Sequence, residues 1–300
     1  MLVDQTTNLH ESAEDRMAGQ LKAHTYGKHQ VRVSKVRRPR QAAANTERHE
    51  FVEVSVDVEL HGDFDAAYTE GDNRSVIATD TCKNTIYCLA KDHPVDTIES
   101  FGLAIGRHFC GQYDHVDSCR VMLKERVWDR LGDSPHGFVA RDASTPTAEV
   151  HVSSSGEATV RSGLENLLIA KTTESGFEDF HRDEYRTLAD TDDRIFATSV
   201  TAGWRYATAE ADFAAGRAAI VEALLARFLD HYSRSVQESL YFMGQAALDS
   251  CGDAAEITLT LPNKHHLLVD LSPFGRENEN EVFVATDEPF GFISATVGRE

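Results

Sequence analysis

The ten residues 51–60 read FVEVSVDVEL, and they decide the fold class of this 300-residue chain. From Val52 to Leu60 every even position is apolar, and the odd positions between them are acidic or serine. Side chains alternate between two faces along a β-strand, so this pattern predicts a strand with one apolar face and one wet face. Such strands are typical of antiparallel sheets that are covered on one side only.

The segments around this strand complete a first structural unit. We predict one helix over residues 79–90, with Thr79 and Asp80 as capping residues, and a second over residues 95–110. The second helix carries a single apolar stripe, formed by Ile98, Phe101, Ile105 and Phe109. Further strands are predicted over residues 31–36, 116–127 and 137–140.

The same order of strands and helices recurs in the rest of the chain. Strands are predicted over residues 150–152, 158–160, 167–172 and 195–206, helices over 211–232 and 235–248, and closing strands over 257–261 and 267–271. We therefore predict two tandem modules, residues 22–141 and 142–300, after a mobile acidic tail over residues 1–21. Helix pairs packed on one face of antiparallel sheets place the chain in the α+β class.

The composition bounds the class of partner and the compartment. Acidic residues outnumber basic ones by 49 to 30, which gives a formal net charge of -19. Such a surface repels polyphosphates and anionic membranes, so we expect neither nucleic acid nor a membrane as partner. We find no transmembrane run, signal peptide or peroxisomal tripeptide, and the five cysteines contain no C-x-x-C pair. We therefore expect a cytoplasmic protein with reduced thiols.

Two clusters carry side chains that could do chemistry. His108, Cys110, His115 and Cys119 lie within twelve residues, and zinc accepts such ligands. Their spacing matches no established ligand pattern, so we expect them to be structural. The second cluster, residues 261–266, reads LPNKHH. Its amide, amine and two imidazoles could donate hydrogen bonds, relay protons or bind a metal.

Several segments, in this order, resemble the urate oxidase (uricase) family. They are Tyr26-Gly27-Lys28, Val31-Arg32-Val33, residues 75–80 (SVIATD), residues 83–87 (KNTIY), Phe180 with residues 182–185 (RDEY), Ser235-Val236-Gln237, residues 261–265 (LPNKH) and residues 296–299 (TVGR). The resemblance covers residues 24–299, nearly the whole predicted fold. It implies two tandem tunnelling-fold modules per chain, with paired helices outside a barrel of antiparallel strands that two chains close. It also implies a homotetramer with active sites at dimer interfaces.

The resemblance implies oxidation of urate by dioxygen and water to 5-hydroxyisourate and hydrogen peroxide, with no cofactor and no metal. It assigns a catalytic proton relay to Lys28, Thr79 and His265. It assigns urate binding to four residues. Phe177 stacks on the purine, Arg194 and Gln237 bind opposite edges of it, and Val236 contacts it through its backbone. It further places Thr79 and the Asp80 backbone N–H against the ligand, and Asn263 beside dioxygen or water. Lys264 and His266 are expected to point to the other face of their strand.

Two alternatives remain open on the sequence. One is a zinc-dependent enzyme of the same fold that acts on pterins, supported only by the cluster of His108, Cys110, His115 and Cys119. The other is a non-catalytic purine-binding scaffold, which predicts a broken relay. Lys28, Thr79, Asn263 and His265 are all present, which favours the enzyme.

Overall fold

A computed structural model describes residues 19–38 and 48–299. The predicted tail over residues 1–21 therefore lies outside the described residues except for 19–21. Ten strands form one sheet in the order β1-β2-β3-β6-β7-β8-β10-β11, with β9 paired to β8 and β12 paired to β9. The strands of this sheet are β1 Tyr26–Arg37, β2 Glu50–Gly62, β3 Val116–Arg126, β6 Thr145–Ser153, β7 Ala158–Lys171, β8 Phe196–Tyr206, β9 Ala254–Thr260, β10 Asn263–Leu268, β11 Phe283–Gly291 and β12 Ser294–Gly298.

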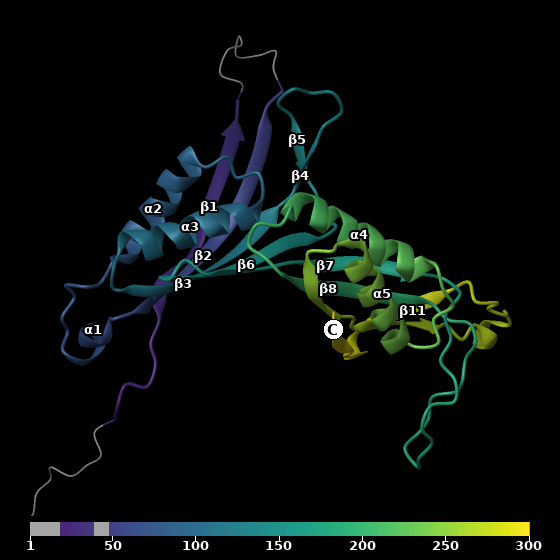
Figure 1. Ribbon diagram of the computed structural model, residues 1–300. Helices are drawn as coiled ribbons and strands as arrows, with labels where there is room; N and C mark the ends of the chain where they lie inside the picture. Colours follow the sequence, from purple (N-terminus) through teal and green to yellow (C-terminus); the bar gives the residue numbers. More distant parts are fainter. Residues whose placement is uncertain (1–18, 39–47, 300) are drawn as a thin grey trace, which may run out of the picture.

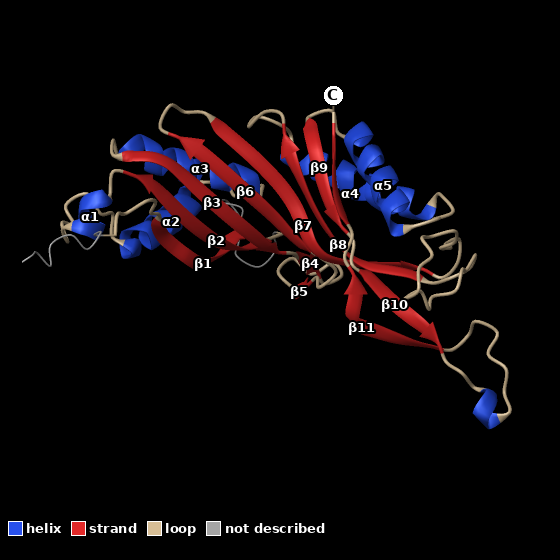
Figure 2. Cartoon of the chain, turned by 90° about the horizontal axis from the view of Figure 1, so that it is seen from below, coloured by secondary structure: helices blue, strands red, loops and turns tan. Residues whose placement is uncertain are grey.

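Two helix pairs cover one face of this sheet. Helices α2 (Thr79–Asp92) and α3 (Ile98–Gln112) lie over the first strands, and α4 (Phe213–Leu229) and α5 (Val236–Ser250) lie over β7 to β9. Figure 2 shows the opposite face of the sheet, where the helices stay behind the strands. All the pairings in the sheet are antiparallel. The α+β class, with paired helices on one face of an antiparallel sheet, is confirmed.

The local patterns that predicted these elements hold where they were strongest. In β2, Val54, Val56, Val58 and Leu60 are at most 1% exposed. The stripe predicted on α3 is also buried. The capping prediction for α2 is wrong in detail, because the N-cap is Ala78 and makes no side-chain bond, so Thr79 and Asp80 occupy the first turn. Among the described residues, no helix has both the length and the apolarity needed to cross a membrane.

The sequence patterns predicted the strands less well where the pairing register between neighbouring strands is irregular. The strands predicted over residues 158–160 and 167–172 are one strand, β7, whose register to β8 shifts between Leu164 and Leu167. Asn166 has a φ of 64° at this bulge, which breaks the alternation along the chain. The closing strand predicted over residues 267–271 corresponds to β10, which begins earlier in the chain, at Asn263, and ends at Leu268. The predictions missed β11, β12 and the short β4 (Trp128–Arg130), which pairs with β5 (Phe138–Ala140).

A buried ion pair links the two halves of the chain. Glu99 of α3 is 1% exposed and receives hydrogen bonds from Arg217 of α4 and from Ser162 of β7. The other guanidinium nitrogen of Arg217 donates to the Gly163 carbonyl at 2.8 Å. The sheet also continues from β3 through β6 to β7 without a gap. The division into modules at residue 142 stays a prediction.

One short α-helix and one 3-10 turn lie outside the layered core. Helix α1 (Asp65–Thr69) follows β2, and the 3-10 turn η1 (Ser272–Phe274) lies between β10 and β11. The β10–β11 hairpin extends away from the main sheet in Figure 2. The loop between β7 and β8, residues 172–195, also projects from the sheet as the teal-green segment below the second helix pair in Figure 1.

Candidate active site

A hollow of about 340 Å³ lies where this loop meets α5 and β10. We call it the α5–β10 hollow. It is lined by Phe177, Leu188, Thr191, Arg194, Ile195, Val236, Gln237, Asn263, His265, His266, Leu267 and Ile293. Six of these had been predicted from sequence as site residues: Phe177, Arg194, Val236, Gln237, Asn263 and His265. The structure brings them together from three segments that are far apart in the chain.

Backbone hydrogen bonds in the 172–195 loop fix Phe177 and Arg194. The Phe177 N–H donates to the Thr191 carbonyl at 2.7 Å, and the Thr191 N–H donates back at 3.1 Å. The Arg194 N–H donates to the Ser175 carbonyl at 2.8 Å. The loop therefore folds back on itself, and it holds the Arg194 guanidinium carbon 5.3 Å from the centre of the Phe177 ring.

Arg194 is a half-buried cation without a protein counter-charge. Its Nε is buried and makes no hydrogen bond, and no carboxylate in the described part of the chain forms an ion pair with it. Burial lowers the pKa of Arg194, although a guanidinium stays protonated at neutral pH. Burying an unpaired charge is costly unless a ligand supplies the partner. The planar donor fork is suited to an anion with adjacent acceptors.

The N-terminus of α5 contributes a second wall. Ser235 caps the helix by accepting a bond from the Glu238 N–H at 3.1 Å. The next residues, Val236 and Gln237, begin the helix, where free N–H groups carry partial positive charge. The Gln237 side chain adds an amide with one donor side and one acceptor side. This wall therefore favours an anionic ligand that also carries hydrogen-bonding edges.

A buried hydrogen-bond chain supports this helix end from behind. His231 Nε2 lies 2.8 Å from the Ser239 hydroxyl, which donates to the Ser233 hydroxyl at 2.6 Å. Ser233 in turn donates to the Ser235 carbonyl at 3.1 Å. Burial lowers the pKa of His231. The chain therefore fixes the cap of α5 and ends at the His231 ring, whose Nδ1 lies 2.7 Å from the Arg227 carbonyl oxygen.

Strand β10 supplies the third wall. Asn263 pairs with Thr198 of β8 and with Gly291 of β11, and the register to β11 shifts between Asn263 and His265. Lys264 bonds Asp287 at 2.6 Å and does not line the hollow, as expected. The prediction for His266 is wrong, because His266 lines the hollow beside His265. The irregular register explains why simple alternation fails here.

The other predicted site residues lie at the far side of the sheet. Lys28 is on β1, and Thr79 and Asp80 begin α2; we call these three residues the β1–α2 cluster. The Asp80 carboxylate accepts bonds from Lys83 and from Asn84, the latter at 3.0 Å. The bond from Lys83 is the main cause of a lowered Asp80 pKa, and the charge of Lys28 adds to it. The charge of Lys28 therefore acts on the Asp80 carboxylate between β1 and α2.

A glycine fixes the path of β1 beside Lys28. A Cβ at Gly27 would lie 1.8 Å from the Val58 carbonyl oxygen, so no larger residue fits. Immediately after Lys28 the pairing with β2 shifts, and Gln30 adopts a φ of 58°. This bulge sets the direction of the Lys28 side chain at the strand edge.

The structure does not bring the whole predicted relay together within one chain. His265 lies in the α5–β10 hollow, whereas neither Lys28 nor Thr79 lines it. In the sheet, β1 is one edge, and β10 follows β8 toward the other. A site that contains all three residues therefore needs two copies of the chain, one that supplies Lys28 and Thr79 and another that supplies His265.

The sequence cluster that resembled a zinc site does not converge. Within residues 19–38 and 48–299, no three His, Cys, Asp or Glu side chains are placed so that they could hold a metal ion. Cys110 bonds the Val152 carbonyl at 3.3 Å, and the His115 ring packs edge-on against Phe64. Cys119 is fully buried, and burial raises its pKa, which opposes the thiolate that zinc binds.

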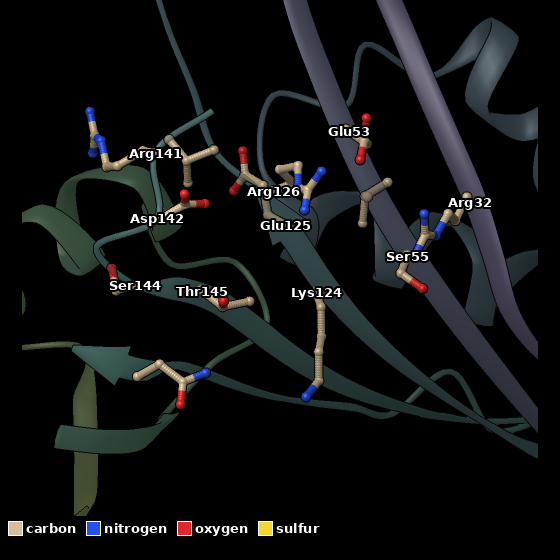
Figure 3. Close-up of a pocket in the computed structure, with 13 residues that line it drawn as sticks. Arg32, Glu53, Ser55, Lys124, Glu125, Arg126, Arg141, Asp142, Ser144 and Thr145 are labelled. Carbon is tan, nitrogen blue, oxygen red and sulfur yellow. The ribbon is translucent and has the colours of Figure 1, made fainter. Parts of the chain in front are cut away.

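Figure 3 shows a second hollow, of about 310 Å³, between β2, β3 and the segment that leads into β6. Its charged side chains are Arg32, Glu53, Lys124, Glu125, Arg126, Arg141 and Asp142. Lys124 pairs with Glu165 at 2.7 Å, and Arg141 pairs with Asp129. Its lining holds four cationic and three acidic side chains, whereas Arg194 lines the α5–β10 hollow with no acidic residue beside it in the lining.

Sequence reasoning missed part of the hollow. Leu188, Thr191, Ile195, Leu267 and Ile293 line it without a pattern that distinguishes them from ordinary loop or core residues. Thr191 contributes through its backbone pairing with Phe177, which has no sequence signal. Phe180 belongs to the resemblance, but nothing in the sequence indicated that its ring would stack on Phe177 at 4.6 Å.

Comparisons with known proteins agree on one family. The family model described as Uricase matches residues 24–151 and 160–294. A uricase from Arthrobacter globiformis is 46% identical over 275 residues, covering 92% of this chain and 88% of the relative. A uricase from Dictyostelium discoideum is 37% identical over 280 residues, covering 91% of this chain and 96% of the relative. The crystal structure of the Arthrobacter globiformis uricase matches with a TM-score of 0.89 at 44% identity, covering 94% of this chain and 96% of that one.

Proposed function

Because the chain belongs to the uricase family and is a urate oxidase, we propose that it converts urate, dioxygen and water into 5-hydroxyisourate and hydrogen peroxide without a cofactor. The observation that carries this proposal is the unpaired guanidinium of Arg194 beside the Phe177 ring. A planar anion satisfies both groups, because the guanidinium binds its charged edge and the ring stacks on its face. Gln237 pairs with the opposite edge through its amide.

The chemistry follows from the electron-rich character of ionised urate. Dioxygen is a triplet, so it reacts slowly with most singlet organic molecules, but a purine anion can give it one electron directly. Urate loses two electrons in total and gains a hydroxyl from water. Dioxygen takes the two electrons and two protons and leaves as hydrogen peroxide. The protein must bind the anion, move protons and hold dioxygen or water against the ring.

The β1–α2 cluster and β10 have suitable groups for these tasks. Lys28 accepts a proton when its amine is neutral, and the Thr79 hydroxyl can both accept and donate one. His265 completes the proposed relay. Asn263 and Thr79 hold dioxygen or water above the ring. The Asp80 backbone N–H, in the first turn of α2, adds a donor near the anion.

The distance between the two ends of the sheet supports an active site built from two chains. In this arrangement the β1–α2 cluster of one protomer closes the α5–β10 hollow of another. Edge strands such as β1 expose unpaired backbone groups, and pairing between protomers removes such edges. We propose a homotetramer in which each dimer interface carries such sites.

The test combines purified protein with urate in a strong chelator and follows dioxygen uptake and peroxide formation together. We expect one dioxygen consumed and one peroxide formed per urate, with no effect of the chelator. Arg194→Gln should bind urate more weakly under the same conditions. Binding without oxygen uptake by a folded, assembled protein would instead identify a purine-binding scaffold. Loss of activity in chelator would contradict catalysis without a metal.

A further inference from the structure

A column of stacked groups lies behind the α5–β10 hollow. The Phe177 and Phe180 rings are stacked at 4.6 Å with an angle of 10° between their planes. The guanidinium carbon of Arg186 lies 4.0 Å from the centre of the Phe180 ring. Phe180 and Arg186 do not line the hollow, whereas Phe177 does. The order outward from the hollow is therefore Phe177, Phe180, Arg186.

Arg186 is held firmly in this position. Its Nη2 pairs with the Asp190 carboxylate at 2.7 Å, and its Nε donates to the Leu188 carbonyl at 3.0 Å. Its side chain is only 16% exposed. Leu188 and the nearby Thr191 line the hollow, and Thr191 is bonded to Phe177 through its backbone. Arg186 thus connects both sides of the loop that presents Phe177.

We propose that Arg186 is a positioning residue that also favours anionic over neutral purines. The proposal rests on the function given above, in which urate stacks on Phe177. The face of an aromatic ring is electron-rich and repels an anion. A cation packed on the far side of the stack is attracted to the ring faces and offsets this repulsion. Arg194 binds the ligand directly, whereas Arg186 acts through Phe180 and Phe177.

The chain provides a matched control in Arg182. Arg182 also pairs with Asp190, at 3.3 Å, but it is 71% exposed and stacks on no aromatic ring in the described part of the chain. Arg182→Met and Arg186→Met therefore remove the same charge from the same loop, and only Arg186→Met removes the cation from the column. Arg186→Lys keeps the charge and loses the planar fork.

Urate binding is measured by calorimetry without dioxygen, so that the ligand is not consumed. We expect Arg186→Met to weaken binding about threefold to thirtyfold, with a matching rise in KM and little change in kcat. The Arg186→Lys variant should lose less affinity for urate, and the affinity of Arg182→Met should stay close to that of the unmodified protein. Arg186→Met affinity equal to that of Arg182→Met would overturn the proposal.

Xanthine separates the electrostatic role from a purely structural one, since it can be offered in neutral or anionic form by changing pH. We expect Arg186→Met, compared with Arg182→Met at each pH, to lose more affinity for the anion than for the neutral form. Equal loss for both forms would remove the charge preference. If Arg186→Met fails to fold, Arg186→Gln compared with Arg182→Gln provides the same comparison, because each again removes one cation, and equal affinity in the two would reject the role.

Phe177→Leu, measured in parallel, distinguishes failure of this inference from failure of the proposed function. Weaker binding by Phe177→Leu with normal binding by Arg186→Met would reject the role of Arg186 alone. Normal binding by Phe177→Leu would reject stacking on Phe177 and the column with it.

Discussion

The β1–α2 cluster and the α5–β10 hollow are both built at a helix N-terminus, yet they differ in shape and in chemistry. Thr79 and Asp80 are exposed, and the carboxylate of Asp80 is bonded by neighbouring side chains. The hollow has walls on several sides, an aromatic ring and an unpaired arginine. In the proposed function the first end supplies Lys28 and Thr79 to the relay, and neither of these residues lines the hollow at the other end. In the proposed function most of the binding groups therefore gather at the hollow, whereas the relay is shared between the two ends, because His265 lies in the hollow.

The substitution with the largest expected effect is at Lys28, which we place in proton transfer and not in the hollow that binds urate. Lys28→Met should lower kcat by roughly 10²–10⁴-fold, the usual contribution of general acid–base catalysis. Urate binding measured without dioxygen should change little, because the hollow is intact. Near-full activity would remove Lys28 from the mechanism, and an equal loss of binding would mean that the two ends are not functionally distinct.

Mixing two variants that are each weakly active at low urate concentration tests whether the ends come from different chains. Lys28→Met and Arg194→Gln protomers are unfolded and refolded together in equal amounts. With random pairing, a site is intact in about one quarter of cases, because each half must come from the other variant. Activity should therefore recover to about a quarter of the unmodified level. Recovery no greater than the average of the two separate variants would place both ends in one chain.

A change on the binding side should affect a different kinetic parameter. Arg194→Gln removes a charge-assisted bond and should raise KM by about 10-fold to 100-fold. Gln245→Ala changes an exposed amide on α5 that bonds Tyr241, away from the hollow, and is a suitable control. A loss confined to kcat, with unchanged anaerobic binding, would contradict the division of roles.

The smallest expected effect is on the pH dependence of stability, through His231 in the hydrogen-bond chain behind the hollow. Burial lowers the pKa of His231 below its ordinary value of 6.5, so the unfolded chain binds a proton more readily than the folded one. The contribution to stability is therefore complete above about pH 6.5 and declines as the pH falls below that value toward the lowered pKa. Thermal unfolding of the assembled protein from pH 8 to 5 measures this. His231→Gln should show a flatter pH dependence, and an unchanged slope would exclude His231 as its source.

The two ends also differ in how far sequence reasoning could predict them. The alternation in β2 and the stripe on α3 follow from local periodicity, because each buries one face against the other layer. Phe177 and Arg194 lie in a loop with no periodicity, and only the resemblance to a family indicated their roles. The bulges at Asn166 and after Lys28, and the stacking of Arg186 on Phe180, depend on contacts that form only in the folded chain.

The buried pair of Glu99 and Arg217 makes the chain hard to divide. A fragment that ended before β6 would keep Glu99 without its cation, and the complementary fragment would keep Arg217 without its carboxylate. Removing one partner from a buried ion pair typically costs about 3–5 kcal/mol. Engineers who wish to split the protein into two co-expressed halves, or to exchange one half for a foreign one, should first replace this pair with apolar residues of similar volume.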